Sequence, residues 1–94
     1  MDDERARAHI IIKGHVQGVF FRANIREKAR ELGLTGWVGN HPSGTVEAVF
    51  EGDKRSIEKI IEYCEMGPPA AEVEDLDIEW RPFQREFNTF YIRY

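Results

Sequence analysis

Hydrophobic and polar positions change their spacing several times along the first third of the chain. Residues 9–13 are mostly apolar and β-branched, which predicts a strand. Residues 14–18 begin and end with glycine, a composition that favours a loop. Apolar residues then recur at helical spacing over residues 21–32, and Gly33 stands where a glycine commonly ends a helix. This stretch therefore predicts a strand, a loop and a helix.

The remainder of the chain shows the same two kinds of spacing. Apolar residues recur at i, i+3, i+4 and i+7 from Ile57 to Cys64, which predicts a second helix that Asp53 can cap. In a strand predicted after the turn at residues 41–44, the alternation puts Glu47 and Glu51 on a face exposed to water. The further predicted strands cover residues 35–40, 45–51, 76–80 and 90–94.

The order of these elements is strand, helix, strand, strand, helix, strand, with one more strand at the end. This order predicts an α+β fold, the ferredoxin-like split βαβ sandwich, with two helices on one face of an antiparallel sheet. Two strands joined by a crossover helix run parallel, so their carboxyl ends lie at the same edge of the sheet. We therefore expect Arg22, which follows the first strand, and Asn40, which ends the second, to lie near each other.

Length and composition limit the class of protein. A chain of 94 residues with 41% hydrophobic residues makes one domain, which we place at residues 8–94, after a charged flexible leader at residues 1–7. No segment is long and apolar enough to cross a membrane, and the net charge of −4 argues against binding nucleic acid. Cys64 is the only cysteine, so no disulfide can form within the chain, and we expect this side chain to be buried and the protein to be in the cytoplasm. We also expect the protein to be a monomer.

The loop between the first strand and the first helix is a candidate phosphate site. Gly14 and Gly18 free the backbone so that successive N–H groups can face one anion, next to the positive end of the helix. The guanidinium of Arg22 can bind two phosphate oxygens, and the carboxamide of Asn40 can hold a water. Spacing alone leaves open a tight turn with a solvated arginine, and an asparagine that only forms a turn.

The other polar residues suggest no further site. His9, His15 and His41 lie at no spacing typical of a metal site, so we expect no metal and no cofactor. None of the 17 acidic residues forms a recognisable acid and base pair.

Two segments resemble the signatures of the acylphosphatase family. Residues 14–22, GHVQGVFFR, are similar to G-x-V-Q-G-V-x-F-R, and residues 36–46, GWVGNHPSGTV, are similar to G-[FYW]-V-x-N-x-x-x-G-x-V. The ending FYIRY at residues 90–94 resembles F-x-I-R-Y. One departure is Gly39, where many members carry a longer residue.

The resemblance implies an activity and assigns roles to residues. The activity would be metal-independent hydrolysis of a small acyl phosphate by direct attack of water, with inorganic phosphate as product and inhibitor. Arg22 would bind the phosphate, and Asn40 would orient the water. The backbone of five residues would hold the phosphate oxygens: His15, Val16, Gln17, Gly18 and Val19.

Two other functions have the same predicted architecture. One is a regulatory or partner-binding module that keeps the phosphate loop but has little activity. The other is an RNA-recognition module, which needs aromatic side chains and positive charge on its sheet and is disfavoured by the acidic chain.

Overall fold

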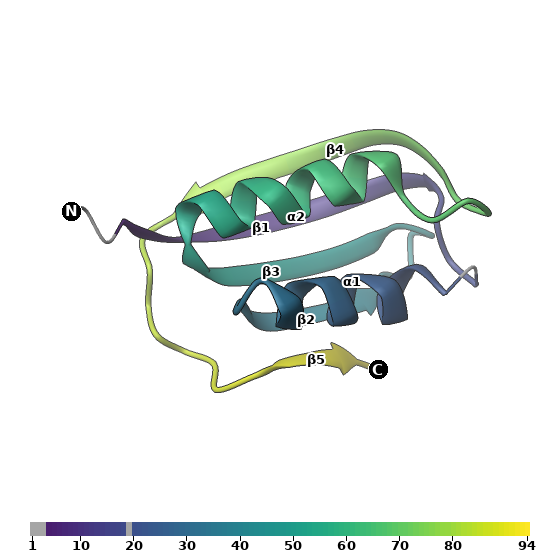
Figure 1. Cartoon of the computed structure of the whole chain (residues 1–94). Helices are drawn as coiled ribbons and strands as arrows, with labels where there is room; N and C mark the ends of the chain where they lie inside the picture. The colour runs from purple at the N-terminus through teal and green to yellow at the C-terminus, as the bar shows by residue number, and fades with distance from the viewer. Residues whose placement is uncertain (1–3, 19) are drawn as a thin grey trace.

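The protein is a five-stranded sheet with two helices on one face (Figure 1). The structure is a computed structural model, and it describes residues 4–18 and 20–94. Its helices are α1 (Phe21–Glu31) and α2 (Lys54–Met66). Its strands are β1 (Arg5–His15), β2 (Thr35–Asn40), β3 (Val46–Asp53), β4 (Glu72–Arg81) and β5 (Phe90–Arg93). The α+β split βαβ arrangement with one added strand is confirmed.

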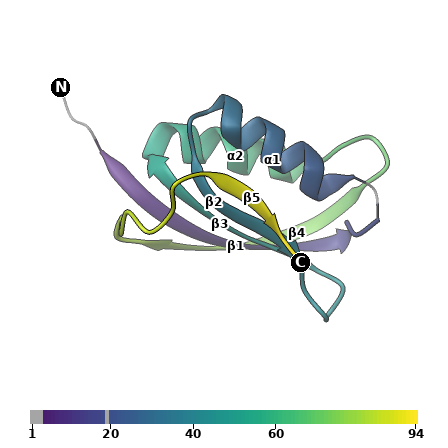
Figure 2. The same cartoon turned by 90° about the horizontal axis from the view of Figure 1, so that it is seen from below.

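The sheet is mixed, and the prediction that it is antiparallel is wrong for its last strand. The order is β4-β1-β3-β2-β5, and every pair is antiparallel except β2 with β5. β4 ends at the end of the sheet where β2 begins. The connection after β4, residues 82–89, crosses that end of the sheet to the opposite edge (Figure 2). β5 therefore starts beside the first residues of β2 and runs parallel to it.

β1 is longer than the sequence predicts at both ends. Residues 5–7, which we expected in the flexible leader, belong to the strand, and Arg7 is buried. At the other end the pairing with β4 shifts between Lys13 and Gly14, which is a β-bulge. Gly14 has a φ of 131°, and a Cβ there would lie 2.0 Å from a backbone oxygen of β4. The strand therefore continues to His15, which we expected in the loop.

The core lies between the helices and one face of the sheet. Alternate residues of each strand face the helices, as the pleat requires. Gly36 is paired with Phe50 on one side and with Phe90 on the other. The two phenyl rings stack with centroids 5.2 Å apart. The fully buried side chains of the sheet and helices include Ile10, Ile12, Phe21, Ile25, Val38, Val46, Phe50, Ile57, Ile60 and Phe90.

The predicted helix ends are confirmed. α1 is followed by Gly33 in the left-handed conformation, with a φ of 72°. α2 begins after Asp53, whose carboxylate accepts a hydrogen bond of 2.9 Å from the backbone N–H of Arg55. Cys64 of α2 is fully buried, as expected.

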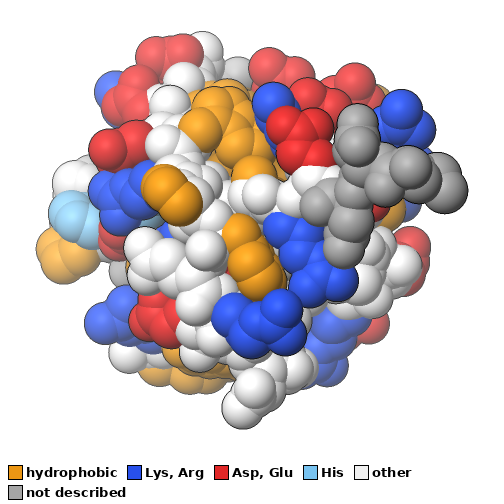
Figure 3. Space-filling model, turned by 90° about the vertical axis from the view of Figure 1, so that its left-hand side faces the viewer, with side chains coloured by type: hydrophobic (Ala, Val, Ile, Leu, Met, Phe, Trp, Pro, Cys, Tyr) orange, Lys and Arg blue, Asp and Glu red, His pale blue; other side chains and the backbone are white. Residues whose placement is uncertain are grey.

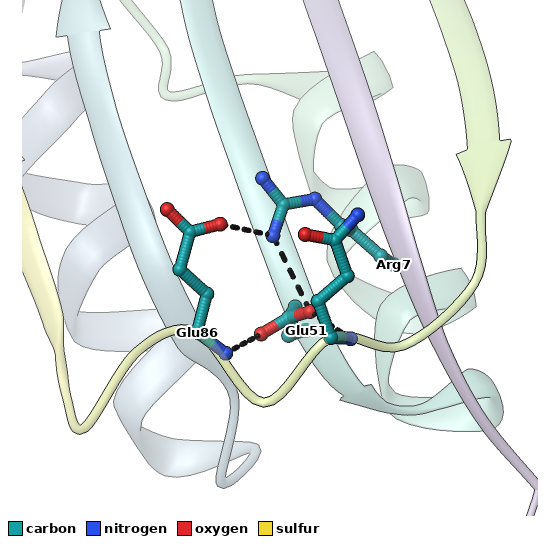
Figure 4. Close-up of polar contacts among 4 residues, drawn as sticks. Arg7, Glu51 and Glu86 are labelled. Atoms are coloured by element: carbon teal, nitrogen blue, oxygen red, sulfur yellow. Dashed lines mark hydrogen bonds and ion pairs between the residues drawn. The ribbon is translucent and has the colours of Figure 1, made fainter.

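Glu51 of β3 is fully buried, although the alternation predicted it to face water. The connection at residues 82–89 covers it, because its carboxylate accepts hydrogen bonds from the backbone N–H of Gln84 at 2.7 Å and of Glu86 at 2.9 Å. Arg7 lies between the Glu51 and Glu86 carboxylates, 3.4 Å from the first and 2.6 Å from the second (Figure 4). These contacts hold the connection against the sheet. Figure 3 shows this end of the molecule, where apolar side chains lie among basic, acidic and uncharged ones.

Candidate active site

The loop after β1 leads directly into α1 and leaves the start of this helix without a cap. Gly18 and Phe20 both adopt left-handed conformations, with φ of 74° and 61°. Among the residues that the structure describes, no side chain caps α1, and its first turn holds no acidic residue. Its first N–H groups therefore keep their capacity for an anion, and the helix dipole adds positive charge there. Val19, one of the five predicted loop residues, lies outside the described residues.

Arg22 lies in the first turn of α1, at the side of a hollow of about 240 Å³. Its guanidinium carbon lies 5.5 Å from the ring centroid of Tyr94, at the end of the chain. Within the described part of the chain Arg22 forms no ion pair, and no aspartate or glutamate lines the hollow. The lining consists of Val16, Gly18, Phe20, Phe21, Arg22, Ala23, Ile92 and Tyr94. A guanidinium in a hollow without acidic side chains is a suitable environment for an anion.

Asn40 is the last residue of β2 and is exposed. Since Val38 points into the core beneath the helices, strand alternation places Asn40 on the same face of the sheet, the face that carries α1. Asn40 lines a second hollow of about 350 Å³, and Tyr94 lines both hollows. The start of α1 and the end of β2 lie at the same end of the molecule as the C-terminus (Figure 1). The hollows of the two predicted catalytic residues share Tyr94 in their linings.

Gln17 joins the two segments that carry these residues. Its side-chain amide donates hydrogen bonds of 2.9 Å to the carbonyl oxygens of His41 and Thr45, in the turn after Asn40. Val16, in the same loop, is buried in the hydrophobic core and anchors the loop to it. Gln17 was expected to act only through its backbone, and the contact of its side chain with the turn was not predicted. The loop and the turn are thus held in one arrangement.

The histidine side chains have other partners or face solvent, although His41 lines the hollow of Asn40. His9 pairs with Glu47 at 2.6 Å, with both side chains on the uncovered face of the sheet. His41 contacts Ser43 within its own turn, and His15 is exposed. Among the described residues, no group of three or more histidine, cysteine or acidic side chains is placed to hold a metal. No helix in the described part of the chain is long and apolar enough to cross a membrane.

Sequence reasoning missed three side chains that line the hollow around Arg22: Phe20, Ile92 and Tyr94. The alternation of the last strand could have predicted part of this lining, because it places Ile92 and Tyr94 on the face of the sheet that carries the helices. Their position beside Arg22 also depends on the parallel pairing of β5 with β2, which local pattern does not show.

The chain is similar in sequence to proteins of one family. The acylphosphatase family model matches residues 8–92. An acylphosphatase of Aeropyrum pernix is 54% identical over 93 residues, covering 98% of this chain and 92% of that protein. An acylphosphatase of Pelotomaculum thermopropionicum is 50% identical over 90 residues, covering 96% of this chain and 98% of that protein.

Solved structures agree as well. The structure of an acylphosphatase from Coxiella burnetii is 40% identical with a TM-score of 0.89, and the match covers 95% of this chain and 93% of that one. The acylphosphatase from Bacillus subtilis is 31% identical with a TM-score of 0.91, and the match covers 95% of this chain and 99% of that one. Similarity in sequence and in fold over nearly the whole length gives one assignment: the chain belongs to the acylphosphatase family of enzymes.

Proposed function

We propose that this enzyme hydrolyses acyl phosphates to a carboxylate and inorganic phosphate in the hollow around Arg22. The observation that carries the proposal is that Arg22 forms no ion pair with a carboxylate among the described residues. Arg22 also lies beside the start of α1, which no described side chain caps. A guanidinium and unused helix N–H groups in one hollow together favour a phosphate dianion. The family assignment supports the same substrate class.

In this proposal the phosphate is held by main chain and guanidinium together. Arg22 binds two oxygens in its fork, and the backbone N–H groups of residues 15–19 bind the remaining charge. Phosphoryl transfer to water passes through a loose transition state with charge on the equatorial oxygens. Donors that are already in place stabilise that charge without reorganising, which lowers the barrier.

Asn40 orients the attacking water in the same proposal. Its carboxamide has both a donor and an acceptor, so it can hold a water in line with the bond that breaks. The water oxygen forms a bond to phosphorus, and the bond between phosphorus and the acyl oxygen breaks. The leaving carboxylate is a weak base and needs no proton, and a phosphate oxygen takes the proton of the water. Neither a protein base nor a metal is then required.

The role of Arg22 is tested by Arg22→Gln, with Arg26→Gln on the next turn of α1 as the matched control. Both changes remove one positive charge from the same helix, but Arg26 does not line the hollow. We expect Arg22→Gln to weaken competitive inhibition by inorganic phosphate and to lower kcat/KM for an acyl phosphate by roughly 10³-fold. Equal effects of the two changes would contradict the proposal.

The role of Asn40 is tested by Asn40→Ala, with Asn88→Ala in the exposed connection as control. We expect kcat to fall roughly 10²–10³-fold while inhibition by inorganic phosphate stays near normal. Weaker phosphate inhibition with retained kcat would refute the assignment. The assays are run in EDTA, and loss of all activity there would refute metal independence.

The same assays separate an enzyme from a module that only binds. Inhibitable turnover supports the proposal, whereas phosphate binding without turnover would favour a regulatory or partner-binding role. We further propose that the protein is a monomer, which size-exclusion chromatography with light scattering can test. We place it in the cytoplasm because its one cysteine is a free thiol.

A further inference from the structure

Two exposed aromatic side chains line the hollow around Arg22. Phe20 is 82% exposed and Tyr94 is 98% exposed, although most aromatic surface in a small domain is buried. Both line the hollow, together with Val16, Phe21 and Ile92. Among the described residues of this lining, Arg22 has the only charged side chain. The hollow thus combines one cation with an apolar wall, which fits a ligand that has one anionic and one apolar end.

Phe20 gains nothing from its position in the folded chain alone. Its φ of 61° is a conformation that glycine adopts freely and that a residue with a large side chain adopts at a cost. Its ring is exposed, so burial does not offset this cost. A glycine at this position would serve the backbone better. The presence of phenylalanine is explained if its ring contacts something that the free protein lacks.

Tyr94 connects the apolar wall to the catalytic residues. Its ring lies 5.5 Å from the guanidinium carbon of Arg22, and it lines the hollow of Asn40 as well. A group attached to a phosphate that is bound at Arg22 would extend from the phosphate past these side chains. For an acyl phosphate, that group is the acyl chain.

We propose that Phe20 and Tyr94 form a clamp for the acyl group, and that the enzyme prefers acyl phosphates whose acyl group is aromatic or bulky and apolar. This inference rests on the proposed function, because it requires an acyl phosphate in the hollow. Apolar contact with the two rings removes acyl surface from water, and an acetyl group has less apolar surface to bury than a benzoyl group. The preference therefore appears in kcat/KM for the larger substrate.

The test compares benzoyl phosphate with acetyl phosphate in the wild type, Phe20→Gly and Phe20→Leu. Glycine suits the backbone at this position, so Phe20→Gly removes the ring without adding strain. We expect the ratio of kcat/KM for benzoyl phosphate to that for acetyl phosphate to fall roughly tenfold in Phe20→Gly and to recover in part in Phe20→Leu. Because each ratio is compared between variants, the different intrinsic reactivities of the two substrates cancel.

Met66→Ala is the matched control, since Met66 is 81% exposed and does not line the hollow. We expect Met66→Ala to leave the ratio unchanged and Tyr94→Ala to lower it. An unchanged ratio in Phe20→Gly, with both substrates hydrolysed, would overturn the clamp and leave the proposed function standing. If the wild type hydrolyses neither substrate, the proposed function fails and the clamp fails with it.

Discussion

Replacing Glu51 with glutamine should destabilise the protein strongly, although the two side chains have the same size. The Glu51 carboxylate is fully buried and accepts backbone hydrogen bonds of 2.7 Å from Gln84 and 2.9 Å from Glu86. A glutamine amide has only one acceptor oxygen, and its NH₂ group would face the second backbone donor. A buried N–H without an acceptor costs about 1–3 kcal/mol.

The contribution of Arg7 to this effect should be small. Its guanidinium lies 3.4 Å from Glu51 and keeps its shorter contact of 2.6 Å with Glu86. Replacing the carboxylate also removes the cost of burying its charge, which offsets part of the loss. We therefore expect the free energy of unfolding to fall by about 2 kcal/mol, most of it from the orphaned N–H.

Equilibrium unfolding in urea measures this change. With a slope of about 1–3 kcal/mol per molar for a small protein, the midpoint should fall by roughly 1 M at constant slope. Glu58→Gln on the exposed face of α2 is the control and should stay within about 0.5 kcal/mol of the wild type. Trypsin should also cleave at Arg85 faster in Glu51→Gln, because the connection opens more often. A loss below about 0.5 kcal/mol, or equal effects of both substitutions, would refute the reasoning.

Three further outcomes are expected. Gln17→Ala removes two hydrogen bonds of 2.9 Å between the loop and the turn, and should lower the free energy of unfolding in urea by about 1–2 kcal/mol and kcat/KM as well. Gly36→Ala, with a φ of 135° and a Cβ that would lie 1.9 Å from the Val49 oxygen, should cost at least about 2 kcal/mol, and Gly44→Ala in an open turn less. Burial raises the pKa of the Cys64 thiol to about 12, so it stays protonated, and an aromatic disulfide reagent should label it between about pH 7 and 9 only after urea unfolds the chain.

Much of the architecture could be predicted because local pattern and fold agree. The apolar spacing of the helices, the glycine after α1 and the aspartate before α2 all act over a few residues, and the structure confirms them. The rule that a crossover joins parallel strands brought Arg22 and Asn40 to one end of the sheet. The structure has both at that end, lining hollows that share Tyr94.

The errors concern effects of distant segments. Alternation along β3 places Glu51 opposite the core, and nothing near it in the sequence shows that residues 82–89 cover it. The direction of β5 depends on where that connection ends, so the parallel pairing was also missed. Arg7 was assigned to a charged leader because only its neighbours in the sequence were considered. Its partners in the fold, Glu51 and Glu86, lie far along the chain.

The candidate site spans two strands that do not touch each other, since β3 lies between β1 and β2. β2 and β3 form a local hairpin, but β1 joins this hairpin through pairs such as Arg7 with Glu51, which are 44 positions apart. Closing such a long segment is a slow step in folding. A chain with only the hairpin formed has Asn40 in place and lacks the Arg22 side of the site. Recovery of turnover during refolding therefore reports completion of the sheet.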